Sequence, residues 1–175
     1  MMPHPLTRRR GVLVVVLLGW VAGAACQREP VDRAVLNAWL TCVECTDGEL
    51  DSVQALARRA PATVDTLQKD LLQGPSPFQR DQLTVQMQTS YQRLATYNAN
   101  DPTSDSLGFS QAEFVARYLG NVVMIYQGRA AYGLGAIGGI RARQALDSAL
   151  QFSPDSFPPN VWAQIHFARD SLIGP

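Results

Sequence analysis

Apolar residues recur every three or four positions along most of this chain, and that spacing limits its fold more than any other feature. The first such segment has apolar residues at Val31, Val35, Leu36, Trp39, Leu40 and Val43. Intervals of three and four place side chains on one face of an α-helix, whereas a strand needs an alternation of two, which no segment shows convincingly. The sequence therefore predicts an all-α fold.

Capping and turn residues divide the periodic segments into about six to seven helices. Helix ends are predicted at Thr46-Asp47-Gly48 and at Gly74-Pro75, and Ser110 with Glu113 forms a capping box that starts a later helix. A bend is expected within residues 133–139, with loops at 98–108 and 153–159. The predicted helices are 31–43, 47–57, 61–74, 76–98, 110 to beyond 126, 140–151 around Ile140, and 160–172.

The N-terminal region has the three parts of an export signal. Arg8, Arg9 and Arg10 precede an apolar stretch from Val12 to about Val21, and small residues follow. That stretch is about ten residues long, and a membrane-spanning helix needs roughly twenty. We therefore expect residues 1–25 to be a cleaved signal peptide.

The small residues end in Gly23-Ala24-Ala25-Cys26, which resembles a bacterial lipobox. The resemblance implies cleavage before Cys26, acylation of its thiol, a short tether over residues 26–30 and a helical domain over 31–175. Gly23 departs from the large aliphatic residue usual at that position, and cleavage after Ala24 would instead release a soluble periplasmic or secreted protein. Gln27, not Asp, follows Cys26, so the resemblance implies an outer-membrane anchor facing the periplasm.

Charge argues against nucleic-acid binding. The chain has 15 basic and 15 acidic residues, and residues 1–25 hold three arginines and no acid, so the remainder has 12 basic and 15 acidic residues, a net charge of −3. No cationic surface of the kind that binds nucleic acid is expected from this balance.

Cys42 and Cys45 form a C-x-x-C pair at the predicted end of the first helix. In an oxidising compartment, a disulfide between them is expected if Cys26 carries lipid. A redox or metal-binding pair is the alternative, although the C-terminal end of a helix does not lower a thiol pKa, and a second zinc half-site is lacking. Thr46 stands where a haem-attachment motif needs histidine.

Three further patterns have structural explanations. Gly133, Gly135 and Gly138 form a G-x-G-x-x-G, but a helical segment precedes them, so close helix packing is expected rather than dinucleotide binding. The loop with Asn98, Asn100, Asp101 and Asp105 lacks a calcium-binding frame. His166 is the one histidine after the signal and lies in a predicted helix. The aromatic residues at core-facing spacing are Trp39, Tyr91, Tyr118, Tyr126 and Trp162.

Two segments share a spacing of leucines and a terminal proline: Leu56, Leu67, Leu71 and Pro75, and Leu134, Leu146, Leu150 and Pro154. The second, within residues 129–150, resembles a HEAT-type helical repeat, and residues 49–72 are a looser match. The resemblance implies a divergent stack of helix pairs that binds other proteins.

These observations predict a membrane-tethered helical module of the cell envelope that binds an unidentified protein partner. No catalytic residue, metal site, nucleotide or other cofactor is expected. The alternative is a thiol–disulfide or metal-binding envelope protein that uses Cys42 and Cys45.

Overall fold

The computed structural model describes residues 30–42, 44–100 and 107–172, and this part of the chain is helical without strands. The predicted all-α fold is confirmed. The elements are α1 (Arg33–Thr41), α2 (Asp47–Arg59), α3 (Ala62–Gln73), α4 (Pro77–Asn100), α5 (Gln111–Ile137), α6 (Gly139–Ala149), the short 3₁₀-helix η1 (Pro154–Ser156) and α7 (Pro159–Ser171).

Helix ends follow the capping residues closely. Asp32 accepts hydrogen bonds from the Ala34 and Val35 amides, so α1 starts two residues later than its apolar pattern suggests. Thr46 and Ser110 form capping boxes with Glu49 and Glu113. The expected bend lies at Gly138 and Gly139, which have φ of 71° and 79°. Gly133 and Gly135 stay inside α5, because only the last two glycines adopt the left-handed conformation that ends a helix.

α5 is the central helix of the fold and packs against all six other α-helices. Its fully buried residues lie between Tyr126 and Leu134. Trp39 of α1 reaches this part of α5, where its indole N–H donates to the Arg129 carbonyl at 2.9 Å. The other helices complete the core with small and branched aliphatic side chains, among them Leu36, Leu56, Leu67, Leu71, Leu146, Val161 and Ile165.

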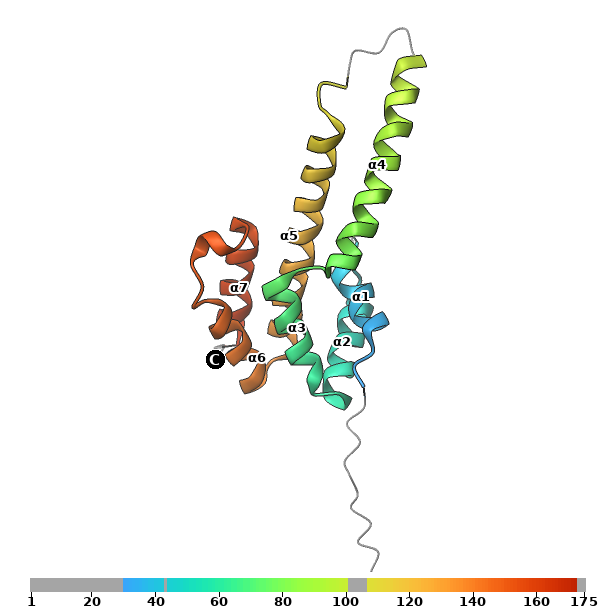
Figure 1. Ribbon diagram of the computed structural model, residues 1–175. Helices are drawn as coiled ribbons and strands as arrows, with labels where there is room; N and C mark the ends of the chain where they lie inside the picture. The colour runs from blue at the N-terminus through green and yellow to red at the C-terminus, as the bar shows by residue number, and fades with distance from the viewer. Residues whose placement is uncertain (1–29, 43, 101–106, 173–175) are drawn as a thin grey trace, which may run out of the picture.

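α4 and the first half of α5 form a helical hairpin that projects beyond the other helices (Figure 1). We call α4 and residues 111–125 the arm, and the remaining helices with the second half of α5 the body. Met87 is the one buried residue of α4, and none is buried among residues 111–125. Toward its tip, the Tyr91 hydroxyl donates to the Phe109 carbonyl at 3.0 Å, and the Tyr91 ring contacts Phe109 and Phe114.

Several predicted core positions are less buried than their spacing suggests. Trp39 and Tyr126 are buried as expected, whereas Tyr91, Tyr118 and Trp162 are half-buried. Ile140, expected to face the core of its helix, is 74% exposed. It stands in the first turn of α6, directly after the Gly138–Gly139 bend, where the chain has turned away from α5.

Candidate functional site

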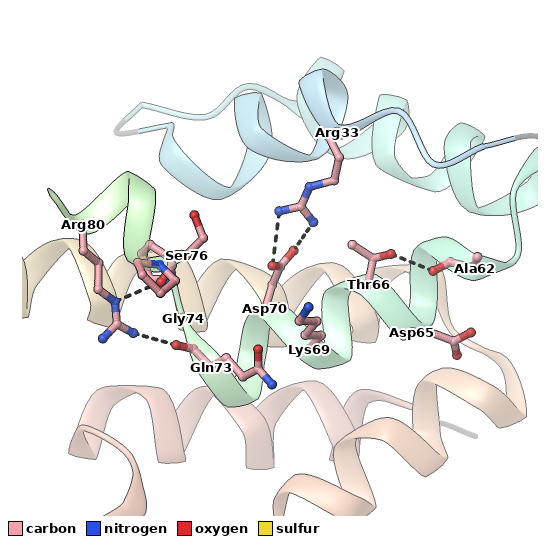
Figure 2. A pocket seen from close by; sticks show the side chains of 12 residues that line it. Arg33, Ala62, Asp65, Thr66, Lys69, Asp70, Gln73, Gly74, Ser76 and Arg80 are labelled. Carbon is pink, nitrogen blue, oxygen red and sulfur yellow. Dashed lines mark hydrogen bonds and ion pairs between the residues drawn. The ribbon is translucent and has the colours of Figure 1, made fainter. Parts of the chain in front are cut away.

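A groove of about 740 Å³ runs along one face of α3 (Figure 2). α3 supplies a helical stripe from Ala62 to Gln73, α1 supplies Arg33, and the start of α4 supplies Pro77 and Arg80. Residues 74–76, which connect α3 to α4, close one end. We call this feature the α3 groove. It lies at the foot of the arm, where α4 leaves the body.

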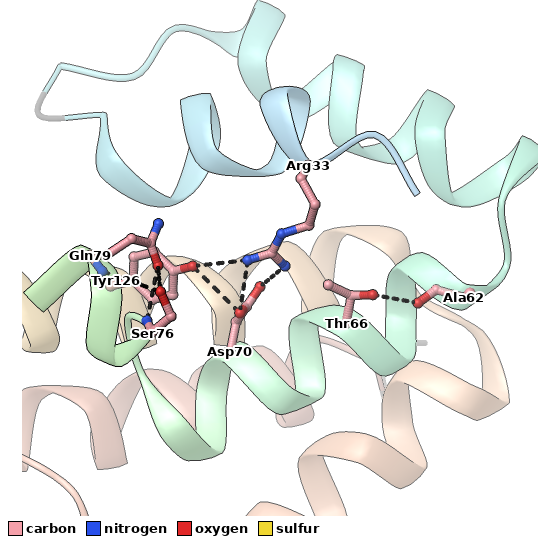
Figure 3. A network of polar contacts seen from close by, with 7 residues as sticks. All are labelled: Arg33, Ala62, Thr66, Asp70, Ser76, Gln79 and Tyr126. Atoms are coloured by element: carbon pink, nitrogen blue, oxygen red, sulfur yellow. Dashed lines mark hydrogen bonds and ion pairs between the residues drawn. The ribbon is translucent and has the colours of Figure 1, made fainter. Parts of the chain in front are cut away.

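Asp70 anchors a polar network at the wall of the α3 groove (Figure 3). Its side chain is almost completely buried, and Arg33 of α1 donates to its two carboxylate oxygens at 2.9 and 3.4 Å. The Tyr126 hydroxyl of α5 donates to the same carboxylate at 3.4 Å and accepts from Arg33 at 3.5 Å. Three helices are therefore joined through one buried carboxylate, which Arg33 compensates.

The network keeps Arg33 charged and Tyr126 neutral. Burial lowers the pKa of the Arg33 guanidinium, but its hydrogen bond to Asp70 and the negative charge of Asp70 outweigh burial, so the pKa is raised. Burial raises the pKa of the Tyr126 hydroxyl, and the Asp70 charge raises it further. Tyr126 therefore remains a hydrogen-bond donor throughout the physiological pH range.

A second guanidinium is fixed at the other end of the α3 groove. The Arg80 Nε–H donates to the Pro75 carbonyl at 2.9 Å, and Nη2 donates to the Gln73 carbonyl at 2.6 Å. The second bond satisfies the carbonyl of the last residue of α3, at a helix end that favours a cation, and the first satisfies a carbonyl of the connection to α4. Gly74 leaves room for this side chain, because a Cβ there would lie 3.0 Å from Arg80 Nη2.

The turn from α3 to α4 is held by a further cap. The Ser76 amide donates to the Gln79 side chain at 2.9 Å, and the Gln79 amide donates back to the Ser76 hydroxyl at 3.3 Å. This reciprocal pair is a capping box at the start of α4. It fixes the direction in which the arm leaves the body.

Lys69 and Asp65 complete the charged lining of the α3 groove. Lys69 is exposed, and its ammonium has no ion pair within the described residues. Asp65 accepts from Arg141 of α6, with both carboxylate oxygens 2.8 Å from Nη2. None of these charged groups was predicted from the sequence to form a site. One signal was present: Asp70 lies beside Leu67 and Leu71 on the apolar face of its helix, where a carboxylate needs a partner.

Cys42 and Cys45 form a disulfide across the turn between α1 and α2, with Cα atoms 5.4 Å apart. Cys42 directly follows α1, as the sequence suggests, whereas Cys45 directly precedes Thr46, the N-cap of α2. Both cysteines are half-buried against the core. Cys26 lies outside the described residues.

The Thr46 amide, next to Cys45, is bonded to a carboxylate. Glu49 accepts from the Thr46 amide at 2.9 Å and from the Thr46 hydroxyl. These bonds lower the pKa of Glu49, the side-chain hydrogen bond most and the backbone bond next. An ionised carboxylate therefore occupies the helix end that would otherwise stabilise a thiolate, and this arrangement favours a structural disulfide.

The other motifs of the sequence lie apart from the α3 groove. Gly133 faces the Trp39 indole and Gly135 faces Ala168, so both glycines serve helix packing. His166 lies on the exposed side of α7, with its ring 5.2 Å from the Trp162 ring. Asn98 and Asn100 end α4, and Asp101 and Asp105 lie outside the described residues.

Comparison with known protein families, curated proteins and solved structures finds no match to this chain. Within the described ranges, no helix combines the length and apolar character needed to cross a bilayer. The same residues contain no cluster of three histidine, cysteine or acidic side chains suited to a metal ion.

Proposed function

We propose that this protein is a membrane-tethered helical module of the bacterial cell envelope that binds another protein. The observation that carries the proposal is the arm. Isolated helices are marginally stable in water, and most helical stability in proteins comes from packing of an apolar face. α4 has 24 residues and buries only Met87, so much of its length is open to further contacts.

The arm exposes side chains that protein interfaces favour. Phe78, Val85 and Tyr97 of α4 are 69%, 62% and 73% exposed, and Leu94 is partly exposed. Aromatic residues are enriched at interfaces, and charged residues are depleted at interface cores. α4 has only Arg80, Asp81 and Arg93 as charged residues. Its composition is therefore suited to burial by a partner.

The proposed lipid tether determines how the arm is oriented relative to the membrane. Residues 26–30 could span about 17 Å if fully extended, which would keep the body close to the membrane. The start of the described chain, before α1, lies at the end of the body remote from the tip of the arm (Figure 1). An anchor at Cys26 would thus leave the arm free to extend away from the bilayer toward a partner.

Site-specific photo-crosslinking in living cells tests the binding function. A photoreactive residue at Val85 or Tyr97 of the full chain should form a discrete adduct, which mass spectrometry then identifies. The same residue at Arg143, an exposed position of α6, is the control. The adduct should disappear when Phe78→Asp is added. Adducts of equal yield at all three positions, or none on the arm, would contradict the proposal.

Replacement of Cys26 tests the tether. The wild-type chain should incorporate labelled palmitate and sediment with membranes, and Cys26→Ser should do neither. Cys42→Ser is the matched control and should retain both properties. A wild-type chain that is released without label and begins at Ala25 would establish cleavage after Ala24 instead.

The disulfide supports one alternative, a thiol–disulfide or metal-binding envelope protein. This function would require Cys42 and Cys45 to cycle between oxidised and reduced forms, or to bind a metal when reduced. Native mass spectrometry of the reduced protein with zinc, together with a glutathione redox titration, decides between the proposals. A disulfide that resists the glutathione pool, together with a reduced protein that takes up no zinc, would exclude this alternative.

A further inference from the structure

The α3 groove gathers positive charge on a chain that is acidic once its signal is removed. Arg33, Lys69 and Arg80 line it, and its two acids, Asp65 and Asp70, are already bonded by Arg141 and Arg33. Three cationic groups thus line the groove with two anionic ones, an excess of one positive charge. Asp32 and Asp81, the acids beside Arg33 and Arg80 in the sequence, do not line the groove.

The same groove is rich in hydrogen-bond donors. Arg33 directs three N–H groups to Asp70 and Tyr126, which leaves two of the five in its guanidinium. Arg80 directs two to backbone carbonyls, which leaves three. The three ammonium donors of Lys69 have no protein acceptor in the described part of the chain. A ligand that fits here must therefore supply acceptors and negative charge.

Two of these cations are held in place before any ligand arrives. Asp70 fixes Arg33 and the Gln73 carbonyl at the end of α3 fixes Arg80, as Figure 2 shows. Tyr126 also accepts a hydrogen bond from Arg33 (Figure 3). Groups held in this way lose little side-chain entropy on binding. Ala62 at one end of the groove and Pro75 and Pro77 at the other add apolar surface to its lining.

The dimensions of the groove suit an extended peptide. α3 has 12 residues and is about 18 Å long. An extended chain advances about 3.3 Å per residue, so roughly five residues would span this length. A flat membrane surface meets protruding groups first, whereas these cations line a recess, which favours a single chain over a bilayer.

We propose that the α3 groove binds a short acidic segment of the partner protein in an extended conformation. Carboxylates of the segment pair with Arg33, Lys69 and Arg80, and its smaller side chains lie over the apolar residues of the groove. This inference rests on the proposed function, since it names the chemistry of the partner at the foot of the arm.

The test uses the full chain in an uncharged detergent and two fluorescent peptides, one of alternating Glu and Ala and one of alternating Gln and Ala. The Glu peptide should bind saturably by fluorescence anisotropy, less tightly at high salt, and the Gln peptide should not bind. Lys69→Glu should weaken binding about tenfold, because an attractive contact becomes repulsive. Arg93→Glu, the same charge reversal on exposed α4 surface outside the groove, should leave binding unchanged.

Crosslinking with a carbodiimide, which joins an amine to a carboxylate, is a second test and identifies where the peptide binds. Mass spectrometry should find the Glu peptide joined to Lys69 Nζ. An absence of saturable binding, or equal effects of Lys69→Glu and Arg93→Glu, would overturn the inference. Binding of anionic vesicles that Lys69→Glu abolishes, with no binding of the Glu peptide, would also overturn it and assign the groove to a lipid headgroup.

Failure of this inference is distinguishable from failure of the proposed function. If the α3 groove does not bind acidic segments, in-cell adducts at Val85 should still form in the Lys69→Glu chain. If those adducts are absent in the wild type as well, the protein-binding function itself is contradicted.

Discussion

Gly135 of α5 lies directly against the backbone of Ala168 in α7. A Cβ at Gly135 would be 3.0 Å from the Ala168 Cβ and 3.1 Å from its Cα. Only glycine lets the two helices approach this closely, because the obstruction is backbone, which cannot rotate away. The second glycine of the G-x-G-x-x-G therefore sets the separation of α5 and α7.

Gly135→Ala should destabilise the protein by about 1–3 kcal/mol, the usual cost of an overpacked helix contact. Gly120→Ala in the same helix is the matched control, since a Cβ there has no neighbour within 4 Å. It should stabilise by about 0.5–1 kcal/mol, because alanine favours the helix. Urea unfolding followed by circular dichroism measures both, and two changes of the same sign would contradict this packing role.

Arg33→Ala should destabilise the fold by about 1–3 kcal/mol, because it leaves the buried Asp70 carboxylate with Tyr126 as its one remaining donor in the network. Asp70→Asn on the Arg33→Ala background should recover part of this loss. The free energies of unfolding of the two single variants, the double variant and the wild type form a double-mutant cycle. A coupling energy near zero would show that the two side chains are independent.

The double variant Cys42→Ser/Cys45→Ser should fold and lose only about 1–2 kcal/mol, because the disulfide closes a very short loop. Reduction of the wild type should cost the same amount, which chemical denaturation with and without reductant can establish. In-cell adducts at Val85 should persist in the double variant. Their loss, despite a folded circular dichroism spectrum, would favour the redox or metal-binding alternative.

Acid should weaken the capping boxes of α2 and α5. Hydrogen bonds from Thr46 and Ser110 lower the pKa of Glu49 and Glu113 below 4.5 in the folded protein. Their stabilisation is therefore complete above the unfolded pKa and is lost as the pH falls through the lower folded values. The double variant Glu49→Gln/Glu113→Gln retains caps that do not titrate. Its free energy of unfolding relative to wild type should be constant above about pH 6 and rise toward about pH 3, and a constant difference throughout would contradict this assignment.

The sequence predicted the helices well because their ends are encoded locally. Thr46, Gly74 and Ser110 each act within a few residues of the chain, so their roles can be read without knowledge of the packing. Burial is different, since it depends on which helix lies opposite. Ile140 lies at a position whose spacing is typical of the core, yet its side chain is exposed. Periodicity alone does not show whether another helix covers such a position.

The candidate site could not be predicted from the sequence, for the same reason. Arg33 and Asp70 are 37 positions apart, and Tyr126 is a further 56 positions along the chain. Their meeting requires α1, α3 and α5 to pack in one arrangement. Arg80 was equally hidden, because its partners are backbone carbonyls that carry no side-chain signature.

α5 is a single helix of 27 residues, and it belongs to both the arm and the body. About 22 Å of it precedes Tyr126 and about 17 Å follows, at 1.5 Å per residue. The helix contains no proline, so it has no built-in kink and behaves as a rod held at one end. If the arm binds a partner as proposed, a sideways load on it would act as torque on the contacts that hold the second half of α5 in the body, and the close Gly135–Ala168 contact with α7 is one of them.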